Sequence, residues 1–273
     1  MLTRPIPSTG EDVPVIGLGT WRAFDVGTDE AAWRPLREVL RLFVDAGGRI
    51  IDSSPMYGRA EMVTGDLLAR GASACLSCDQ GMDDGSRARG RADTAIRQAV
   101  AGRHHRPDAD PQSGRLAHAS RKSQADEGRR LDPLYRHHPL HYWSIAGTRA
   151  YPRPRARHRL VQLGYSLATR AAESELLQVA APQGAAVIAN QPLERGDMFR
   201  RVRGRALPGW AAEFDCASWA QLFLKYILTE PAVTCVIAAT GNPEHITDAL
   251  AAGFGRLPDA RQRRQIRALW DAG

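Results

Sequence analysis

Lysine, cysteine and long apolar runs are all scarce in this chain of 273 residues. Only two lysines occur, Lys122 and Lys225, so any chemistry that needs a lysine is restricted to these positions. Four cysteines do not suggest a disulfide scaffold in a chain of this size, which favours a reducing compartment. No apolar run approaches the roughly 20 residues of a membrane span, and the N-terminal segment 1–13 lacks the apolar core of a secretory signal. We therefore expect a cytoplasmic protein with no membrane partner.

Positive charge is concentrated in the middle of the chain. The formal net charge is +7, but sixteen arginines and seven of the eight histidines lie in segment 72–159, which has no phenylalanine and a single valine. A basic binding protein built on this segment is one alternative, and it predicts steeply salt-dependent DNA retention. No recognisable nucleic-acid module accompanies the charge, so we expect no nucleic-acid partner. Cys75 and Cys78 form a lone CxxC without a second pair, so we expect no metal site.

Outside this segment, apolar strands alternate with amphipathic helices. The pattern predicts strands at 13–18, 49–53, 161–167, 185–189 and 233–238, and helices at 30–46, 61–69, 171–181, 219–228, 245–252 and 259–270. Inside the segment, only residues 93–101 look helical. Continuous apolar strands joined by helices indicate a parallel sheet covered by helices. The chain is long enough for one α/β barrel, which typically needs about 250 residues.

The most specific pattern lies in segments 15–21 and 47–61. The first contains GLGTW, and the second, GGRIIDSSPMYGRAE, is a short apolar strand that ends at Asp52, with Tyr57 five residues later in a Gly-rich bend. Together they resemble the active-site signature of the aldo-keto reductases. Segments 161–177, 185–196 and 205–253 resemble later strands of the same family. The resemblance implies an α/β fold, a (β/α)8 TIM barrel, formed by a single domain over residues 1–273.

The resemblance also implies a reaction. In this family a hydride moves from a reduced nicotinamide to a carbonyl carbon while a tyrosine hydroxyl protonates the oxygen. Because the ordinary pKa of tyrosine is near 10, that acid needs a nearby cation, supplied by a lysine that an aspartate holds; a histidine orients the carbonyl. By resemblance Asp52 is the aspartate and Tyr57 the acid, at the C-terminal ends of the strands. The substrate would be a small aldehyde or ketone.

The same comparison assigns cofactor and substrate positions. Gln162 would meet the nicotinamide carboxamide, Tyr165 would lie near the ring, and the Pro192-Leu193 turn would follow the pyrophosphate. Gly19 and Thr20 of GLGTW complete this part of the cofactor set. Substrate would contact two tryptophans, Trp21 and Trp210, although aromatic packing is an alternative for both.

The adenosine end of the cofactor is expected at the eighth strand. That strand would end at Thr240, and His245 would open a helix whose N-terminal amides favour a phosphate. Relatives that prefer the 2′-phosphate often carry lysine or arginine in this region, where Ala239 and His245 stand here. The family resemblance implies NADP as the cofactor, and because these cations are missing here, NAD stays a possible alternative.

Segment 72–159 interrupts the resemblance. Strands three to five are not encoded in it, and neither are the catalytic lysine and histidine. Shifting the codons by one base can restore the words ATK, IHN and GSIRYIGIT, in the order and at about the spacing of those strands. The lysine codon would straddle Gln80 and Gly81, and the histidine codon Pro111 and Gln112. We hypothesise a displaced reading frame between about 70 and 160; a genuine insertion is the alternative.

Two interpretations of function follow. The chain is an NADP(H)-dependent reductase that is impaired as written, because half of the catalytic group is absent. Alternatively, it is a non-catalytic remnant or pseudogene product with at most weak nucleotide binding. In either case strands two and six are expected to have open edges, which favours aggregation.

Overall fold

Strands from the two ends of the chain form one parallel sheet. The computed structural model describes residues 1–77, 160–174, 176–180 and 182–273. Within these ranges the sheet has the order β4-β3-β7-β6-β5, and every pair of neighbours is parallel. Its strands are β3 (Ile16–Gly19), β4 (Ile51–Asp52), β5 (Leu160–Gly164), β6 (Ala186–Asn190) and β7 (Val233–Ala239). The expected α/β class with a parallel sheet is confirmed.

The pairing of β3 with β7 is the feature that relates this sheet to a barrel. It joins the first and last parallel strands of the chain, with Gly19 opposite Ala239, as the closure of a parallel barrel requires. The sheet is also strongly curved. Four strand spacings of about 4.8 Å would separate its end strands by about 19 Å if it were flat, yet Gln162 of β5 hydrogen-bonds to Asp52 of β4 at 3.0 Å. The described strands therefore form part of a barrel wall.

A short antiparallel hairpin precedes the sheet. Its strands are β1 (Thr3–Pro5) and β2 (Asp12–Pro14). The prediction of one strand over 13–18 was therefore wrong: the chain changes partners between β2 and β3. Pro14 has no amide hydrogen to donate, which suits the end of a hairpin strand and not the interior of a sheet.

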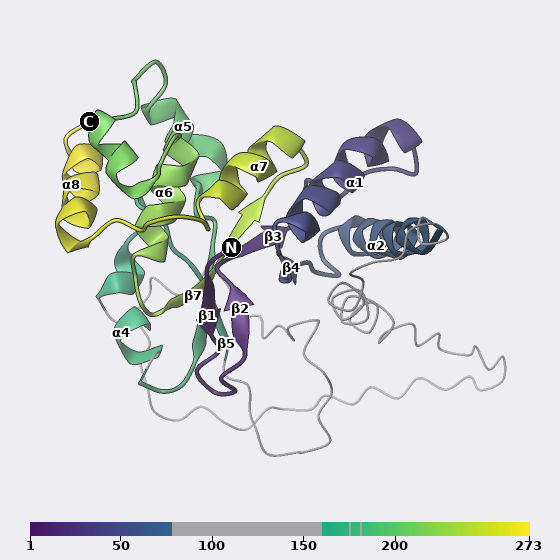
Figure 1. Ribbon diagram of the computed structural model, residues 1–273, viewed down its shortest axis with the longest axis horizontal. Helices are drawn as coiled ribbons and strands as arrows, with labels where there is room; N and C mark the ends of the chain where they lie inside the picture. Colours follow the sequence, from purple (N-terminus) through teal and green to yellow (C-terminus); the bar gives the residue numbers. More distant parts are fainter. Residues whose placement is uncertain (78–159, 175, 181) are drawn as a thin grey trace, which may run out of the picture.

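Helices cover the outside of the sheet (Figure 1). They are α1 (Glu30–Asp45), α2 (Ala60–Ser77), α4 (Leu176–Ala180), α5 (Asp197–Arg201), α6 (Trp219–Leu228), α7 (Pro243–Ala251) and α8 (Ala260–Asp271), with 3-10 turns η2 (Ala171–Glu173), η3 (Glu194–Gly196) and η4 (Gly209–Phe214). Helix α1 packs against α2 and α7, and α6 packs against α7, α8 and β7. None of the described helices is long and apolar enough to cross a membrane.

Local signals place the helix ends. Asp29 caps α1 through the amide of Ala31, and Asp259 and Gln262 form a capping box at the start of α8. The predicted helices are confirmed with shifted ends, except that 171–181 divides into η2 and α4. Helix α2 continues to Ser77, beyond its predicted end. The predicted helix 93–101, Cys78 and most of the segment with the hypothesised frame displacement lie outside the described residues.

The strands bury different side chains on their two faces, as a period of two requires. The outer face packs into the helical layer through Ile16, Leu18, Val187, Ala189, Val236 and Ala238. The inner face holds a smaller cluster of Ile6, Val13, Ile50, Ala186, Ile188, Cys235 and Ile237. Ile6 and Val13 come from the hairpin and its flank, so this segment fills one end of the barrel interior.

A half-buried carboxylate, that of Glu173, joins several elements of the outer layer. Its Oε1 accepts hydrogen bonds from the hydroxyls of Tyr165 and Tyr226, at 2.7 and 2.6 Å, and from Arg263 at 2.9 Å. Its Oε2 accepts from Arg267 at 3.1 Å. Burial raises the pKa of Glu173, but the tyrosine hydrogen bonds and the arginine charges outweigh it, so the pKa lies below its ordinary value. This network joins η2, α6 and α8.

Candidate active site

A polar layer closes the inner face of the sheet at the carboxyl ends of its strands. On β4, Ile50 faces the interior, so Asp52, two residues later, faces the same way. On β6, Ile188 is followed in the same manner by Asn190, and on β5 the inward Leu160 is followed by Gln162. Apolar side chains thus fill the barrel interior, and polar ones lie above them at the strand ends.

These three polar side chains are hydrogen-bonded to one another. Nε2 of Gln162 donates to Oδ1 of Asp52 and to Oδ1 of Asn190, both at 3.0 Å. The structure therefore brings the predicted Asp52 and Gln162 together. Sequence analysis did not identify Asn190, although its position two residues after the inward Ile188 could have indicated it.

Asp52 is fixed through hydrogen bonds to its backbone carbonyl oxygen, and its carboxyl group resists ionisation. The amide and the hydroxyl of Thr20 both donate to the carbonyl oxygen of Asp52 at 3.0 Å. Burial raises the pKa of the Asp52 carboxyl, and the hydrogen bond from Gln162 only partly counters it. Thr20 is itself completely buried, so its part is to join the ends of β3 and β4.

Tyr57 sits in a tight bend just after β4. Its amide donates to the carbonyl oxygen of Ser54 at 2.9 Å. The following Gly58 has φ +59°, and a side chain there would meet the carboxylate of Asp25 at 2.4 Å. Oδ1 of Asp25 also accepts from the amide of Arg59 at 2.9 Å. Asp25, which sequence analysis missed and no local motif marks, thus holds the bend that carries Tyr57.

The electrostatic surroundings do not favour Tyr57 as an acid. Burial raises the pKa of its hydroxyl, and the charge of Asp52 raises it further. Among the described residues the only lysine is Lys225, and its ammonium group donates to the carbonyl oxygens of Phe254 and Arg256, both at 2.8 Å. Within the described part of the chain, therefore, no lysine is placed to lower the pKa of Tyr57.

Gly19 lies at the same level of the sheet, at a position where a side chain would not fit. It pairs with Asp52 on one side and Ala239 on the other. A Cβ at this position would lie 2.8 Å from Cγ2 of Ile237 and 3.0 Å from Cβ of Ala239. The glycine of GLGTW therefore allows the side chain of Ile237 to cross the inner face of β3.

The loop after β6 has a strained backbone, and a residue that follows β5 holds it through a hydrogen bond. Pro192 is buried and Leu193 half-buried against the helical core. Three non-glycine residues of the loop have positive φ, namely Gln191 at 52°, Glu194 at 46° and Arg195 at 56°. Oε1 of Glu194 accepts a 2.5 Å hydrogen bond from the buried hydroxyl of Ser166. Non-glycine residues in this conformation persist only where their surroundings enforce it.

The first turn of α7 offers less to a phosphate than the sequence indicated. The helix begins at Pro243, which has no amide hydrogen, and the amide of Glu244 is already bonded to Oδ1 of Asn242 at 2.8 Å. His245 is the third helical residue and is exposed, so the prediction that it opens the helix was wrong. Thr240 follows β7 directly and accepts from the amide of Asn242 at 3.0 Å. The amide of His245 has no hydrogen-bond partner in the described part of the chain.

One predicted aromatic contact, Tyr165, needs correction, and Trp210 makes the aromatic packing that was its alternative. Tyr165 is completely buried and its hydroxyl bonds to Glu173 in the outer network, so its ring offers no surface to a nicotinamide. Trp210 belongs to η4 and packs on Phe214, with ring centroids 6.1 Å apart, in the helical layer. Tyr165 follows the last residue of β5, where the chain turns toward the helical layer, and Trp210 lies in that layer as part of η4.

Trp21, in contrast, remains at the carboxyl end of the sheet. It follows Thr20 and is half-buried. The guanidinium carbon of Arg22 lies 4.6 Å from the centroid of its ring, and that of Arg195 lies 4.7 Å from it. The expected substrate contact, Trp21, is therefore flanked by two cations.

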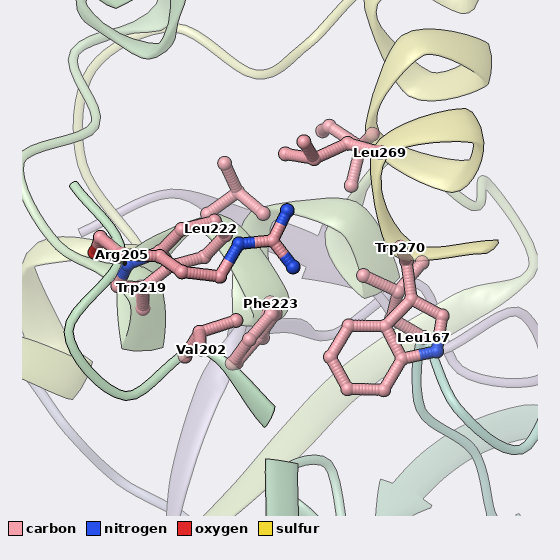
Figure 2. A pocket seen from close by; sticks show the side chains of 9 residues that line it. Leu167, Val202, Arg205, Trp219, Leu222, Phe223, Leu269 and Trp270 are labelled. Carbon is pink, nitrogen blue, oxygen red and sulfur yellow. Dashed lines mark hydrogen bonds between the residues drawn. The ribbon is translucent and has the colours of Figure 1, made fainter. Parts of the chain in front are cut away.

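Two cavities of the described structure lie in the helical layer, away from the strand ends. One lies between α6, α8 and the turn after α5, where Val202, Arg205, Phe223 and Trp270 converge (Figure 2). Its accessible volume of about 10 Å³ is at the lower limit for one water molecule. A second is an open groove of about 460 Å³ between α1, α6 and α7, on the helical surface. Among the described residues, no three histidine, cysteine or acidic side chains converge as a metal site would require.

Comparison with known proteins relates this arrangement to one family. Residues 153–271 match the model of the aldo/keto reductase family. Similar structures include an aldo-keto reductase from Klebsiella pneumoniae in complex with NADPH, with 19% identity over 99% of this chain and 96% of that chain and a TM-score of 0.56. An aldo/keto reductase from the same organism, in complex with NADP and acetate, has 19% identity over 96% and 93% of the two chains and a TM-score of 0.52.

A third similar structure is the holo form of an aldo-keto reductase from Bacillus halodurans. It shares 17% identity over 98% of this chain and 96% of that chain, with a TM-score of 0.53. At these identities the likeness is one of fold. No curated protein sequence matches the chain. The match of residues 153–271 to the aldo/keto reductase family agrees with the resemblance that the motifs had indicated.

Proposed function

We propose that this chain is an NADP(H)-dependent reductase of a small aldehyde or ketone whose catalysis is impaired. The observation that carries the proposal is the polar layer of Asp52, Gln162 and Asn190 at the strand ends, with Tyr57 in the adjoining bend. Complexes of structurally similar reductases with NADP and NADPH support the choice of cofactor. NAD is the alternative.

The residues that are present suit this cofactor in part. When bound, a reduced nicotinamide supplies a hydride to the carbonyl carbon. Both amide hydrogens of Gln162 are used by Asp52 and Asn190, which leaves its carbonyl oxygen to accept a hydrogen bond from the nicotinamide carboxamide. The hydroxyl of Tyr57 would give its proton to the carbonyl oxygen. Pro192 and Leu193 would lie along the pyrophosphate.

The adenosine end would be bound from β7 and α7. Thr240 and the free amide of His245 are the groups available there. The carboxylate of Glu244 in the same turn opposes a phosphate. We therefore expect weak binding and a small preference between NADPH and NADH.

Impairment follows from the raised pKa of Tyr57. Burial and Asp52 both disfavour loss of its proton, and the described residues supply no lysine to counter them. In the displaced-frame hypothesis the codons of the lysine and the histidine fall at 80–81 and 111–112, outside the described residues. Restoring the frame would complete a (β/α)8 barrel in a single cytoplasmic domain over residues 1–273.

A test is to follow NADPH oxidation by purified, mass-verified protein with a panel of small aldehydes and ketones. We expect NADPH to bind, as measured by its fluorescence, with negligible turnover. Any residual turnover should be abolished by Tyr57→Phe. It should also not decline between about pH 7 and 9, because the raised pKa keeps Tyr57 protonated there. Rapid turnover by this exact chain would contradict the proposed impairment.

A second candidate, a non-catalytic remnant, is favoured by the same raised pKa of Tyr57. Residual turnover that Tyr57→Phe abolishes supports the impaired reductase, whereas NADPH binding with no residual turnover at all supports the remnant. Absence of both binding and turnover supports a pseudogene product.

The gene itself separates these cases from an intact enzyme. Resequencing the DNA that encodes residues 60–170 should reveal one or two single-base differences that restore the words ATK, IHN and RYIGIT. If the sequence stands as it is, the displaced-frame hypothesis survives only as a disabling change in the gene.

A further inference from the structure

Two arginines from distant parts of the chain meet on one tryptophan at the carboxyl end of the sheet. Arg22 follows β3 and Arg195 lies in the loop after β6, and both guanidinium carbons are within 4.7 Å of the ring centroid of Trp21. In the sheet, β7 lies between β3 and β6. The stack therefore bridges the two loops that flank the end of β7.

These two cations have no acidic partner among the described residues. Neither Arg22 nor Arg195 takes part in an ion pair there, whereas the exposed Arg41, Arg200 and Arg261 each pair with a carboxylate. Both arginine side chains are exposed. Two like charges on one ring repel each other, and an anion between or beside them would relieve that repulsion.

The backbone at both positions is also unusual. Arg22 has φ 59° and Arg195 has φ 56°, in the left-handed region that arginine rarely adopts. Such strain gathers at binding and catalytic sites, where the surrounding structure enforces it. A guanidinium stacked on an indole keeps its N–H donors in its own plane, free to form a two-point contact with carboxylate or phosphate oxygens.

The stack is connected to the proposed reacting groups through residues next to it in the chain. Trp21 comes directly after Thr20, whose amide and hydroxyl hold the carbonyl of Asp52. Three residues beyond Arg22, Asp25 holds the bend of Tyr57 through the amide of Arg59. An anion bound by Arg22 would therefore belong to a molecule that also reaches the end of β4.

We propose that the carbonyl substrate carries a carboxylate or phosphate group, and that Arg22 and Arg195, stacked on Trp21, bind this anion. The inference rests on the proposed reductase function and names its substrate class. It assigns Arg22 and Arg195 as specificity-determining residues, and it gives Trp21 the task of holding both guanidinium groups at the site.

A matched pair of ligands tests this proposal. Isothermal titration of the full chain would compare 4-carboxybenzaldehyde with methyl 4-formylbenzoate, which differ in charge but hardly in shape. We expect the acid to bind about tenfold more tightly than the ester, as one charge-assisted contact would give. The preference should fall below about twofold in Arg22→Gln and in Arg195→Gln, and it should weaken as the salt rises from about 0.05 M to about 0.5 M.

The control is Arg203→Gln, an exposed arginine outside the stack, in which the preference should persist. Equal affinity for acid and ester in the unaltered chain, or binding of neither, would overturn the proposal. It would also be overturned if both stack variants lost affinity for inorganic pyrophosphate and NADPH while the preference for the acid remained, because the cations would then serve the cofactor. If the acid is preferred through these arginines but NADPH does not bind, the proposed function is contradicted and the anion site is still supported.

Discussion

The two faces of the sheet differ in the side chains that they bury and in how well their carboxylates are hydrogen-bonded. The helical layer on the outer face contains large buried side chains such as Phe43, Phe214 and Phe223, and its half-buried carboxylate Glu173 has four donors. Among the described residues, the inner face holds a small aliphatic cluster without aromatic residues, and its carboxylate, Asp52, has one side-chain donor. The pKa of Glu173 is lowered, whereas that of Asp52 is raised.

This difference separates stability from chemistry. A carboxylate whose charged form is favoured in the folded state adds to stability at neutral pH, and one whose charged form is disfavoured subtracts from it. The outer network therefore stabilises the fold, while the charge of Asp52 in the inner layer costs free energy at the strand ends. Costly arrangements of this kind are typical of functional sites.

The largest effect should come from the outer face. Replacing Glu173 by glutamine removes the charge that Arg263 and Arg267 contact, and should lower the free energy of unfolding by about 3 kcal/mol, measured by urea denaturation at pH 7. Because the folded pKa of Glu173 lies below its ordinary value of 4.5, its contribution is present above that value. The difference between variant and parent should shrink as the pH falls through the lowered pKa.

A matched control for this substitution is Glu38→Gln. Glu38 pairs with Arg41 on the exposed surface of α1, and its loss should leave stability unchanged. An equal loss of stability in both variants would show that Glu173 is no more than an ordinary surface charge.

The next effect concerns close packing on the inner face. Gly19→Ala would place a Cβ 2.8 Å from Cγ2 of Ile237, and we expect it to lower the free energy of unfolding by about 2 kcal/mol. Adding Ile237→Leu, which removes Cγ2, should restore part of this loss. Gly27→Ala, where a Cβ meets nothing within 4 Å, is the control and should be close to neutral. Failure of the rescue would mean that the neighbouring Ala239, and not Ile237, makes the position intolerant.

The smallest effect has the opposite sign. Asp52→Asn should raise the free energy of unfolding by about 1 kcal/mol at pH 7, because it removes a charge that is costly to bury and keeps the acceptor for Gln162. The folded pKa of Asp52 lies above its ordinary value of 3.8, so the cost of its charge appears as the pH rises through that range. The gain should vanish near pH 4. A loss of stability at both pH values would contradict the assignment of Asp52 as a costly residue.

Much of this arrangement could be predicted from the sequence, for identifiable reasons. Asp52 and Tyr57 are separated by one tight bend, so their proximity is local. The parity of β4 and β5 points Asp52 and Gln162 inward whatever the exact strand ends. Tyr165 was misplaced because the sheet ladder of β5 stops at Gly164, and the next residue turns toward the helical layer.

Other features could not be predicted, because they join segments far apart in the chain. Asp25 reaches Arg59 through a loop conformation that no motif marks. The stack of Arg22 and Arg195 on Trp21 exists only because β3 and β6 are separated in the sheet by a single strand, β7.

The sequence by itself determines the local elements of this protein, the end of β4 at Asp52 and the glycines that let strands and bends approach closely, because these depend on periodicity, side-chain size and turn chemistry. The tertiary structure alone decides that β3 pairs with β7, that Gln162 spans the curved sheet to Asp52, and that two arginines share one tryptophan. These contacts depend on the curvature and order of the sheet, which bring together residues that no local pattern connects.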